Sequence, residues 1–294
     1  MVRMSAELLC LLAVHAHPDD ESSKGAGTVA KYHHDGVRTV LVCCTGGEEG
    51  DILNPAMNRE EVKANMAAVR RGELSAAAGI IGYDEVVMLG YRDSGMAESE
   101  ANAHPECFAA APLAEAVDRL ARILRRTRPQ VVLTYGDEQG GYPHPDHLRV
   151  HEITQPAIDQ AADPAWISDA GEPWQVSKVY YSVWSKQRID LTHAKYLELG
   201  LESPYSQDWL DRPWQDDRIN ASIPIDGYTE VRFDALLAHA TQIDPESPFW
   251  FGLPREVAAS IHPYDDYIRA SSRVPVSGLE DDLFAGLHAD APIS

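Results

Sequence analysis

The chain has 294 residues, of which 44% are hydrophobic and 24% are charged, so we expect a packed core rather than disorder. Its 46 Asp and Glu residues outweigh 25 Lys and Arg residues, giving a net charge of -21, which argues against binding to nucleic acids or anionic membranes. No apolar stretch reaches the roughly 18 residues that a membrane-spanning helix needs.

The cysteines and the N-terminal sequence favour a cytoplasmic protein. Cys10, Cys43, Cys44 and Cys107 form no CxxC pair, and three of them lie in apolar runs, where cysteine behaves as a small hydrophobic residue. We therefore expect reduced thiols rather than a disulfide framework or a zinc knuckle. Residues 1–10 also lack the cleavage region of a signal peptide.

The first half of the chain alternates short apolar runs with longer helical patterns, which is typical of a parallel sheet with helical crossovers. A continuous apolar run such as 8–14 indicates a strand buried on both faces. The predicted order is strand 8–14, helix 27–34, strand 39–44, helix 60–80, strand 85–89, helix 113–126, strand 131–135 and helix 145–162. This pattern predicts an α/β fold with a Rossmann-like, mostly parallel sheet flanked by helices.

The pattern weakens after about residue 165. We expect a strand over 176–184, an irregular segment rich in Trp, Pro, Asp and Tyr over 196–220, and a helix over 233–243. One domain with a smaller addition fits a chain of this length. We therefore predict a Rossmann-like domain over residues 1–165 and a C-terminal α+β elaboration over residues 166–294, which walls the site.

Ligands of parallel sheets bind beyond the carboxyl ends of the strands, and a polar cluster follows the first strand there, His15-Ala-His17-Pro18-Asp19-Asp20-Glu21. Imidazole and carboxylate are good zinc ligands, and one tight turn would let His17 and Asp20 reach a single ion. The adjacent Asp19 would then be free to take a proton from a water molecule as a general base. The alternative is a polar turn that caps the next helix.

A second polar cluster, Gly140-Gly141-Tyr142-Pro143-His144-Pro145-Asp146-His147, follows the fourth strand. It supplies a third ligand candidate, His147, together with His144, Asp146 and Tyr142. The paired glycines would let the backbone approach a ligand closely, and Asp146 would orient an imidazole. The alternative is a helix start with polar residues in its first turn. Two such clusters at neighbouring strand ends favour a metal site.

Two further histidines compete for the ion. His151 lies one helical turn after His147, as in other zinc-binding helices, but the HExxH pattern is missing. His15 lies two residues before His17 and would point the same way along a strand. We predict that both residues support the site without binding the ion.

These motifs resemble those of the LmbE-like, or N-acetylglucosaminylphosphatidylinositol deacetylase-like, zinc hydrolases, and within that superfamily they most resemble those of the mycothiol S-conjugate amidases. The similar segments span nearly the whole chain. They are HAHPDDESSKG at 15–25, ILNPAM at 52–57, DSG at 93–95, GGYPHPDH at 140–147, GEPW at 171–174, SKVYY at 177–181, HATQID at 239–244 and LFAG at 283–286.

The resemblance implies one zinc ion per chain, bound by His17, Asp20 and His147, with Asp19 as the general base. Zinc and iron both suit such a ligand set, and the sequence leaves the choice open. The implied substrate is a small-molecule thiol conjugate, and the resemblance is also compatible with a homo-oligomer.

The resemblance further implies that His144 stabilises charge at the reacting centre and protonates the leaving amine, that Asp146 orients His144, and that Tyr142 lies over the oxyanion. The implied substrate contacts are Lys24, Glu48, Arg70 and Asp93. Each of the neighbouring pairs Glu48–Glu49 and Arg70–Arg71 leaves open which residue enters the site, although the spacing to residues 73–74 favours Arg70.

The activity implied is hydrolysis of the glucosamine–cysteine amide of a mycothiol S-conjugate, either in detoxification or in trimming a natural-product intermediate. The alternative is deacetylation of N-acetylglucosaminyl-inositol or a related amino sugar. A binding module without catalysis is disfavoured, because no GxGxxG follows the first strand. A two-metal phosphoesterase would need more bridging carboxylates than the motifs supply.

Overall fold

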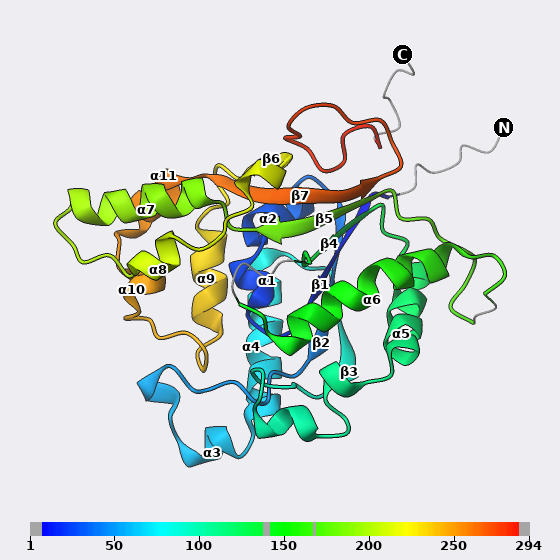
Figure 1. Cartoon of the computed structure of the whole chain (residues 1–294), viewed down its shortest axis with the longest axis horizontal. Coiled ribbons are helices and arrows are strands. Elements are labelled where there is room, and N and C mark those ends of the chain that lie inside the picture. The colour runs from blue at the N-terminus through cyan, green and yellow to red at the C-terminus, as the bar shows by residue number, and fades with distance from the viewer. Residues whose placement is uncertain (1–7, 138–141, 167–168, 288–294) are drawn as a thin grey trace.

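The computed structural model describes residues 8–137, 142–166 and 169–287. Seven strands in this part of the chain form one sheet in the order β3-β2-β1-β4-β5-β7-β6, in which β1 to β5 are parallel and β7 is antiparallel to both neighbours (Figure 1). The strands are β1 (Cys10–His15), β2 (Arg38–Thr45), β3 (Glu85–Tyr91), β4 (Val131–Thr134), β5 (Lys178–Val183), β6 (Ala221–Pro224) and β7 (Tyr264–Ser272). The predicted mostly parallel α/β fold is confirmed.

Helices cover both faces of this sheet (Figure 1). The α-helices are α1 (Asp20–Ser23), α2 (Ala26–His34), α3 (Glu60–Lys63), α4 (Met66–Ile81), α5 (Leu113–Thr127), α6 (Pro145–Ala162), α7 (Lys186–Glu198), α8 (Gln207–Leu210), α9 (Val231–Ala238), α10 (Pro248–Phe251) and α11 (Arg255–Ile261). Short 3-10 turns are η1 (Pro55–Met57), η2 (Glu100–Ala103), η3 (Phe108–Ala110) and η4 (Asp216–Arg218).

The alternation of side chains along β1 divides the core between the two faces. Leu12 and Val14 pack with α5 and α6, whereas Leu11 and Ala13 pack with α2 and α4. A strand buried in this way on both faces must be apolar at every position, which is why the continuous apolar run predicted it. The same alternation leaves the carboxyl end of β1 as the first point where polar residues can leave the core.

The order of the strands fixes where a ligand can bind. The chain winds from β1 to β2 and β3 on one side, and then crosses to β4 and β5 on the other side of β1. The crevice beyond the carboxyl ends of β1 and β4 is therefore the topological switch point, the usual ligand site of open α/β sheets. Both polar clusters singled out in the sequence begin there.

The prediction of one continuous helix over 60–80 is wrong at one point, because the chain leaves helical geometry between α3 and α4. Asn65 has φ -129°, and its side-chain amide donates to the Glu61 carbonyl at 2.8 Å. Asparagine side chains compete with the helix for backbone partners in this way, so the helical pattern continues in sequence while the helix itself is interrupted.

The second half of the chain contains more regular structure than predicted. Helix α7 and strands β6 and β7 were not expected, and the helix expected over 233–243 lies at Val231–Ala238. Strand β7 was not predicted because it contains two adjacent aspartates, Asp265 and Asp266. Adjacent aspartates are typical of a loop in sequence, but these two are buried in the strand. Strands β5, β6 and β7 complete the same sheet, and a domain boundary near residue 165 stays a prediction.

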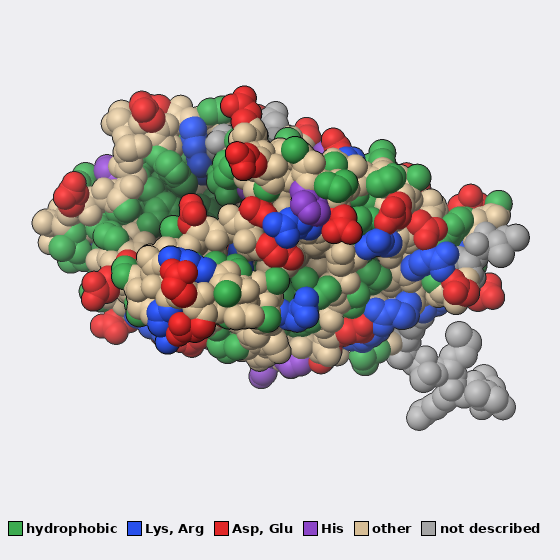
Figure 2. Space-filling model, turned by 90° about the horizontal axis from the view of Figure 1, so that it is seen from below, with side chains coloured by type: hydrophobic (Ala, Val, Ile, Leu, Met, Phe, Trp, Pro, Cys, Tyr) green, Lys and Arg blue, Asp and Glu red, His purple; other side chains and the backbone are tan. Residues whose placement is uncertain are grey.

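Other sequence expectations can be compared with the described residues. The four cysteines are buried and free, so the prediction of unpaired thiols is confirmed. Within the described ranges, no helix is long and apolar enough to cross a membrane. Acidic and basic side chains are mixed across the face shown in Figure 2, in keeping with a surface that carries charges of both signs.

A buried ion-pair network joins the C-terminal strands. Lys178 of β5 is fully buried, and its Nζ lies 2.7 Å from Glu280 Oε1. The Tyr180 hydroxyl donates to the same carboxylate, and Arg269 of β7 pairs with its other oxygen. One carboxylate therefore pairs with two cations and links β5, β7 and the segment that follows β7.

Replacing Glu280 with glutamine should lower the free energy of unfolding by about 3 kcal/mol, because removing one partner of a buried ion pair leaves the other charge uncompensated. Equilibrium urea unfolding measures the change. The matched control is Glu198→Gln, which removes the exposed partner of Lys195 and should cost at most about 1 kcal/mol. Similar small costs for both variants would contradict the assigned importance of the network.

Candidate functional site

The carboxyl ends of β1, β3 and β4 open into a cavity of about 680 Å³. Its two ends differ in chemistry. Among the described residues, the polar end is lined by His17, Asp19, Asp20, Lys24, Arg70, Asp93, His144 and His147. The other end is mainly aromatic. A cavity with a few convergent polar groups beside an apolar wall is the usual form of a small-molecule site.

His17, Asp20 and His147 converge on one point at the polar end. Asp20 Oδ2 lies 3.4 Å from His17 Nδ1 and 3.4 Å from His147 Nε2, and one ligand atom from each of the three residues lies within 4.8 Å of the others. Burial lowers the pKa of His147 to about 4, which keeps this imidazole in the neutral form that binds metals. The structure thus brings together the three predicted ligands.

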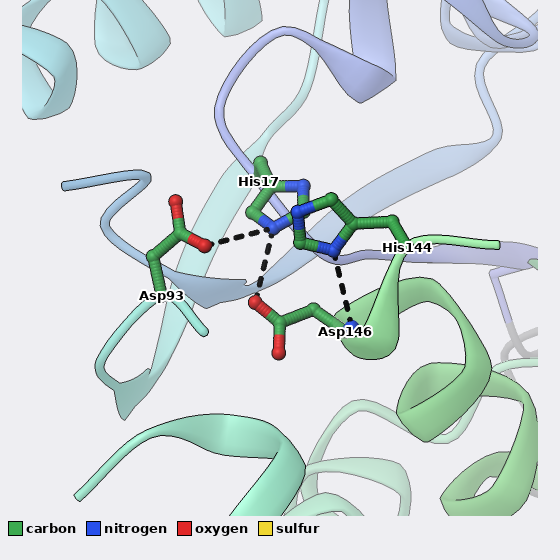
Figure 3. Close-up of side chains that lie close together, drawn as sticks. All are labelled: His17, Asp93, His144 and Asp146. Carbon is green, nitrogen blue, oxygen red and sulfur yellow. Dashed lines mark hydrogen bonds and ion pairs between the residues drawn. The ribbon is translucent and has the colours of Figure 1, made fainter. Parts of the chain in front are cut away.

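The carboxylate of Asp146 contacts His17, not His144 as the resemblance implied. Its Oδ2 accepts from His17 Nε2 at 3.1 Å (Figure 3), and the same carboxylate accepts from the backbone N–H and the hydroxyl of Ser94. A histidine that donates one ring N–H to a carboxylate presents its other nitrogen as a ligand. Asp146 therefore orients His17 Nδ1 toward Asp20.

A second group of possible ligands, His17, Asp93, His144 and Asp146, also lies within 4.8 Å. Asp146 is fully buried and is not among the described residues that line the cavity. A catalytic ion needs an open position that faces the substrate. The group of His17 with Asp20 and His147 meets this requirement, since all three line the cavity.

His144 is the N-cap of α6, and its Nδ1 accepts a hydrogen bond from the Asp146 backbone N–H at 3.2 Å (Figure 3). This bond assigns the ring proton to Nε2. Burial and the neighbouring His17 lower the pKa of His144. The imidazole is therefore a neutral hydrogen-bond donor at the cavity.

Asp19 occupies an unfavourable backbone conformation, with φ 110° and ψ -25°. Its N–H donates to Glu21 Oε2 at 2.9 Å, and its carboxylate accepts from Arg70 at 3.0 Å. Glu21 is in turn bound to the buried His239 at 2.6 Å. Burial raises the pKa of Asp19, and the Arg70 guanidinium acts against this rise. Strained residues held by several partners are typical of functional positions.

The predicted substrate contacts have partners inside the protein. Lys24 Nζ lies 2.6 Å from Asp20 Oδ1, so it balances the charge of the carboxylate that faces the two histidines. Of the two neighbouring arginines, Arg70 is buried and lines the cavity, whereas Arg71 is exposed. Arg70 is therefore the arginine that enters the site.

The structure distinguishes Glu48 from Glu49, between which the sequence left the choice open. Glu48 folds back, and its Oε2 accepts from the Asp93 backbone N–H at 3.0 Å. Glu49 lines the cavity in its place and pairs with Arg92. Asp93 is itself buried, with Oδ1 3.5 Å from His17 Nε2.

Tyr142 lies at the cavity wall and is about half exposed. Its ring centre is 5.5 Å from that of His147 and 6.0 Å from that of His144. The predicted approach of the paired glycines 140–141 to a ligand lies outside the described residues. The structure thus places the tyrosine beside both histidines of its cluster.

Tyr135 was not singled out in the sequence, although it was the last residue of the predicted fourth strand. Its ring stacks on His147 with centres 4.5 Å apart, and its hydroxyl lies 3.2 Å from His15 Nδ1. His151 Nδ1 lies 3.2 Å from the Tyr135 carbonyl oxygen. Both rival histidines therefore contact Tyr135, and neither belongs to a group of possible ligands within the described residues.

The far end of the cavity is an aromatic wall made by Trp184, Trp209, Trp214, Phe249 and Trp250. Trp184 and Phe249 stack with ring centres 5.9 Å apart, and Trp209 lies 5.6 Å from Trp214. Figure 2 shows hydrophobic side chains gathered at the left of the molecule, the end where Figure 1 places α7, α8 and α10. No ring of this wall was singled out individually in the sequence.

Comparison with known proteins agrees with this geometry. The model of the GlcNAc-PI de-N-acetylase family matches residues 12–158. Mycothiol S-conjugate amidase of Streptomyces coelicolor is 45% identical over 293 residues, which covers 96% of this chain and 99% of that protein. The chain belongs to the GlcNAc-PI de-N-acetylase family. The resemblance seen in the motifs is thereby confirmed.

Further members of the family place the activity within one reaction class. A 1D-myo-inositol 2-acetamido-2-deoxy-alpha-D-glucopyranoside deacetylase of Geodermatophilus obscurus is 39% identical, covering 94% of this chain and 97% of that one. N,N'-diacetylchitobiose deacetylase of Pyrococcus horikoshii has the same fold, with a TM-score of 0.62 at 18% identity, over 88% of this chain and 83% of that one. The chain is an amide hydrolase of this family.

The conformation of Asp19 leads to a stability prediction. Asp19→Gly should be more stable than Asp19→Ala by about 1 kcal/mol, because an L-residue at positive φ carries a steric cost that glycine avoids. Both variants remove the contact with Arg70, so the difference isolates the backbone. Urea unfolding in the presence of a chelator measures it.

The control is Asp190, an exposed residue within α7. There the alanine variant should be the more stable one by about 1 kcal/mol, since glycine destabilises helix interiors. Equal stabilities of the two variants at position 19 would show that the backbone there is not strained.

Proposed function

We propose that this protein hydrolyses the amide between the glucosamine nitrogen and the acyl-cysteine of mycothiol S-conjugates, releasing a mercapturic acid and glucosaminyl-inositol. The observation that carries the proposal is the aromatic wall opposite the polar cluster in one cavity of about 680 Å³. An acetyl group requires only a small pocket, whereas a thiol-linked organic group needs an extended apolar surface. The 45% identity to an enzyme named for this activity supports the same substrate.

We further propose one zinc ion per chain, held by His17, Asp20 and His147. Two imidazoles and a carboxylate form a three-residue set that is typical of catalytic zinc, and iron is the alternative for the same donors. Although burial lowers the pKa of His17, the carboxylates of Asp146, Asp20 and Asp93 raise it well above its usual value. This excess of negative charge around the ligands favours a cation. When bound, zinc supplies Lewis acidity toward an amide carbonyl and a water molecule.

The other polar groups of the cavity supply acid–base catalysis and electrostatic stabilisation. Asp19 takes the proton of the attacking water and passes it to the leaving amine, as its position beside Asp20 at the cavity allows. His144 Nε2 donates a hydrogen bond to the oxygen that gains charge in the tetrahedral state. Tyr142 closes the same side of the cavity, and Arg70 holds the Asp19 carboxylate at 3.0 Å. No covalent nucleophile is required.

The second candidate is deacetylation of N-acetylglucosaminyl-inositol. It is favoured by the 39% identity to the Geodermatophilus obscurus deacetylase over 94% of this chain. The same polar cluster would serve both reactions, because both break an amide on an amino sugar. The aromatic wall would then be left without a ligand group, which is why the amidase is preferred. In either case the partner is a small molecule, and we place the reaction in the cytoplasm.

Exchange of the predicted ligands tests the metal site. His147→Ala should lower the bound zinc per chain by at least tenfold, since it removes one of three protein ligands. His151→Ala is the matched control one helical turn away, and it should retain zinc because His151 contacts Tyr135 instead. Elemental analysis after dialysis against a zinc buffer gives both values. Loss of zinc in the His151 variant alone would assign the ion to a different ligand set.

Cleavage of two substrates tests the reaction. The zinc-loaded protein should release amine from a mycothiol S-conjugate faster than from N-acetylglucosaminyl-inositol, with no release in the presence of a chelator. Asp19→Asn should lose at least a hundredfold in kcat while it keeps its zinc, because a general base contributes roughly 10²–10⁴-fold. Preference for the acetylated sugar would make the protein a deacetylase, and full activity of Asp19→Asn would remove the base assignment.

A further inference from the structure

Arg212 brings a positive charge to the cavity. It lines the cavity beside the aromatic wall, and within the described ranges it forms no ion pair. Its Nε is buried without a hydrogen-bond partner. The two other cations at the cavity, Lys24 and Arg70, are paired with Asp20 and Asp19.

Two indole rings hold this guanidinium in place. Its central carbon lies 3.6 Å from the ring centre of Trp209 and 4.1 Å from that of Trp214. The two rings have centres 5.6 Å apart and planes inclined by 62°, so they contact the guanidinium from two different directions. The N–H groups that they leave uncovered can donate to a carboxylate. Burial also lowers the pKa of Arg212, because the charge has lost part of its hydration. An anion in the cavity would replace the interaction with water that the charge has lost.

The aromatic wall defines the rest of the ligand. Trp184 and Phe249 stack with ring planes inclined by 23°, and Leu53, Met96 and Ile243 add aliphatic surface to the same cavity. Aromatic surfaces of this kind bind flat apolar groups by offset stacking and edge contacts. In the proposed reaction, the sugar and the amide occupy the polar end. The group on the cysteine sulfur would extend toward the wall.

We propose that Arg212 binds a carboxylate on the sulfur-linked group of the substrate. The part of this group between the sulfur and the carboxylate would be flat and apolar. This inference rests on the proposed amidase function. It makes Arg212 a specificity residue, because it would contact a part of the substrate remote from the bond that is cleaved. A carboxylate in this position would pair with Arg212, for which the described part of the chain shows no ion-pair partner.

Two mycothiol conjugates of the same shape test the proposal. One carries an S-(4-carboxybenzyl) group and the other an S-(4-carbamoylbenzyl) group, so that they have nearly the same shape but only the first carries a negative charge and two acceptor oxygens. The wild-type protein should cleave the carboxylate with a kcat/KM about 10–100-fold higher, the range expected for hydrogen bonds between charged groups. The difference should lie mainly in KM, since Arg212 binds and takes no part in bond cleavage.

Substitution at position 212 separates recognition from support of the wall. Arg212→Gln should remove the preference while it retains cleavage of the carbamoyl conjugate, and Arg212→Lys should keep part of the preference, because the charge remains without the planar guanidinium. The control is Arg255→Gln, which changes an exposed arginine that pairs with Asp234 outside the cavity. An equal loss on both conjugates in Arg212→Gln would make the arginine a support of the wall and overturn the proposal.

Binding distinguishes failure of the inference from failure of the proposed function. Cleavage of both conjugates at equal rates by the wild-type protein would leave the amidase standing and remove the carboxylate site. If neither conjugate is cleaved, the amidase proposal fails. Binding of the same two conjugates is then measured by titration, with the tryptophan fluorescence of the wall as the signal. Tighter binding of the carboxylate by wild type than by Arg212→Gln would then support the inference, and equal binding would overturn it.

Discussion

The hydrogen bond between His17 Nε2 and the Asp146 carboxylate connects the two strand ends on which the site is built. His17 follows β1 and Asp146 follows β4, which are neighbours in the sheet although they are far apart in the sequence. Ser94, after β3, donates two further hydrogen bonds to the same carboxylate. One buried acid thus fixes the tautomer of His17 and the relative positions of three loops. The group of His17, Asp20 and His147 depends on it, because only the Nδ1 atom of a correctly turned His17 faces the other two.

Prediction succeeded where local sequence determines local structure. The bounds of α6 match those expected, and the first four strands lie within a few residues of their predicted positions, because a strand buried on both faces is apolar throughout. Prediction failed where tertiary contacts outweigh local preference. Asn65 interrupts a helix through a bond of its own side chain. Strand β7 contains Asp266, whose carboxylate accepts from Ser185 and Ser222, partners that lie 81 and 44 residues away.

The same limit applies to the site. His17, Asp20 and His147 could be found because two polar clusters follow strands that must lie side by side, so that the fold alone brings them together. The partner of Asp146 and the choice between Glu48 and Glu49 depend on which way a side chain turns after its strand, and sequence spacing does not decide this. Tyr135 was not predicted as a residue of the site, because an aromatic residue at the end of a strand usually belongs to the hydrophobic core. Trp184 ends the strand expected over 176–184, whereas Trp209 and Trp214 lie in the segment expected to be irregular, and only folding gathers them with Phe249 and Trp250.

The two ends of the cavity separate chemistry from substrate choice. The polar end is built on the carboxyl ends of parallel strands, where small changes would disturb the convergence of several charged groups. The aromatic wall is built on short helices and turns after β5, and Trp184 joins it to α1 by donating a hydrogen bond to the Ser23 carbonyl at 3.2 Å. Relatives named as an amidase and as a deacetylase share 45% and 39% of their residues with this chain. In the two reactions proposed for this chain the amide lies on an amino sugar, so their substrates differ on the acyl side, and the aromatic wall is the part of the cavity proposed to face that side. Arg212 lies in the wall, held by two of its rings. Selection for a charged substrate would therefore act on the wall and leave the catalytic groups unchanged.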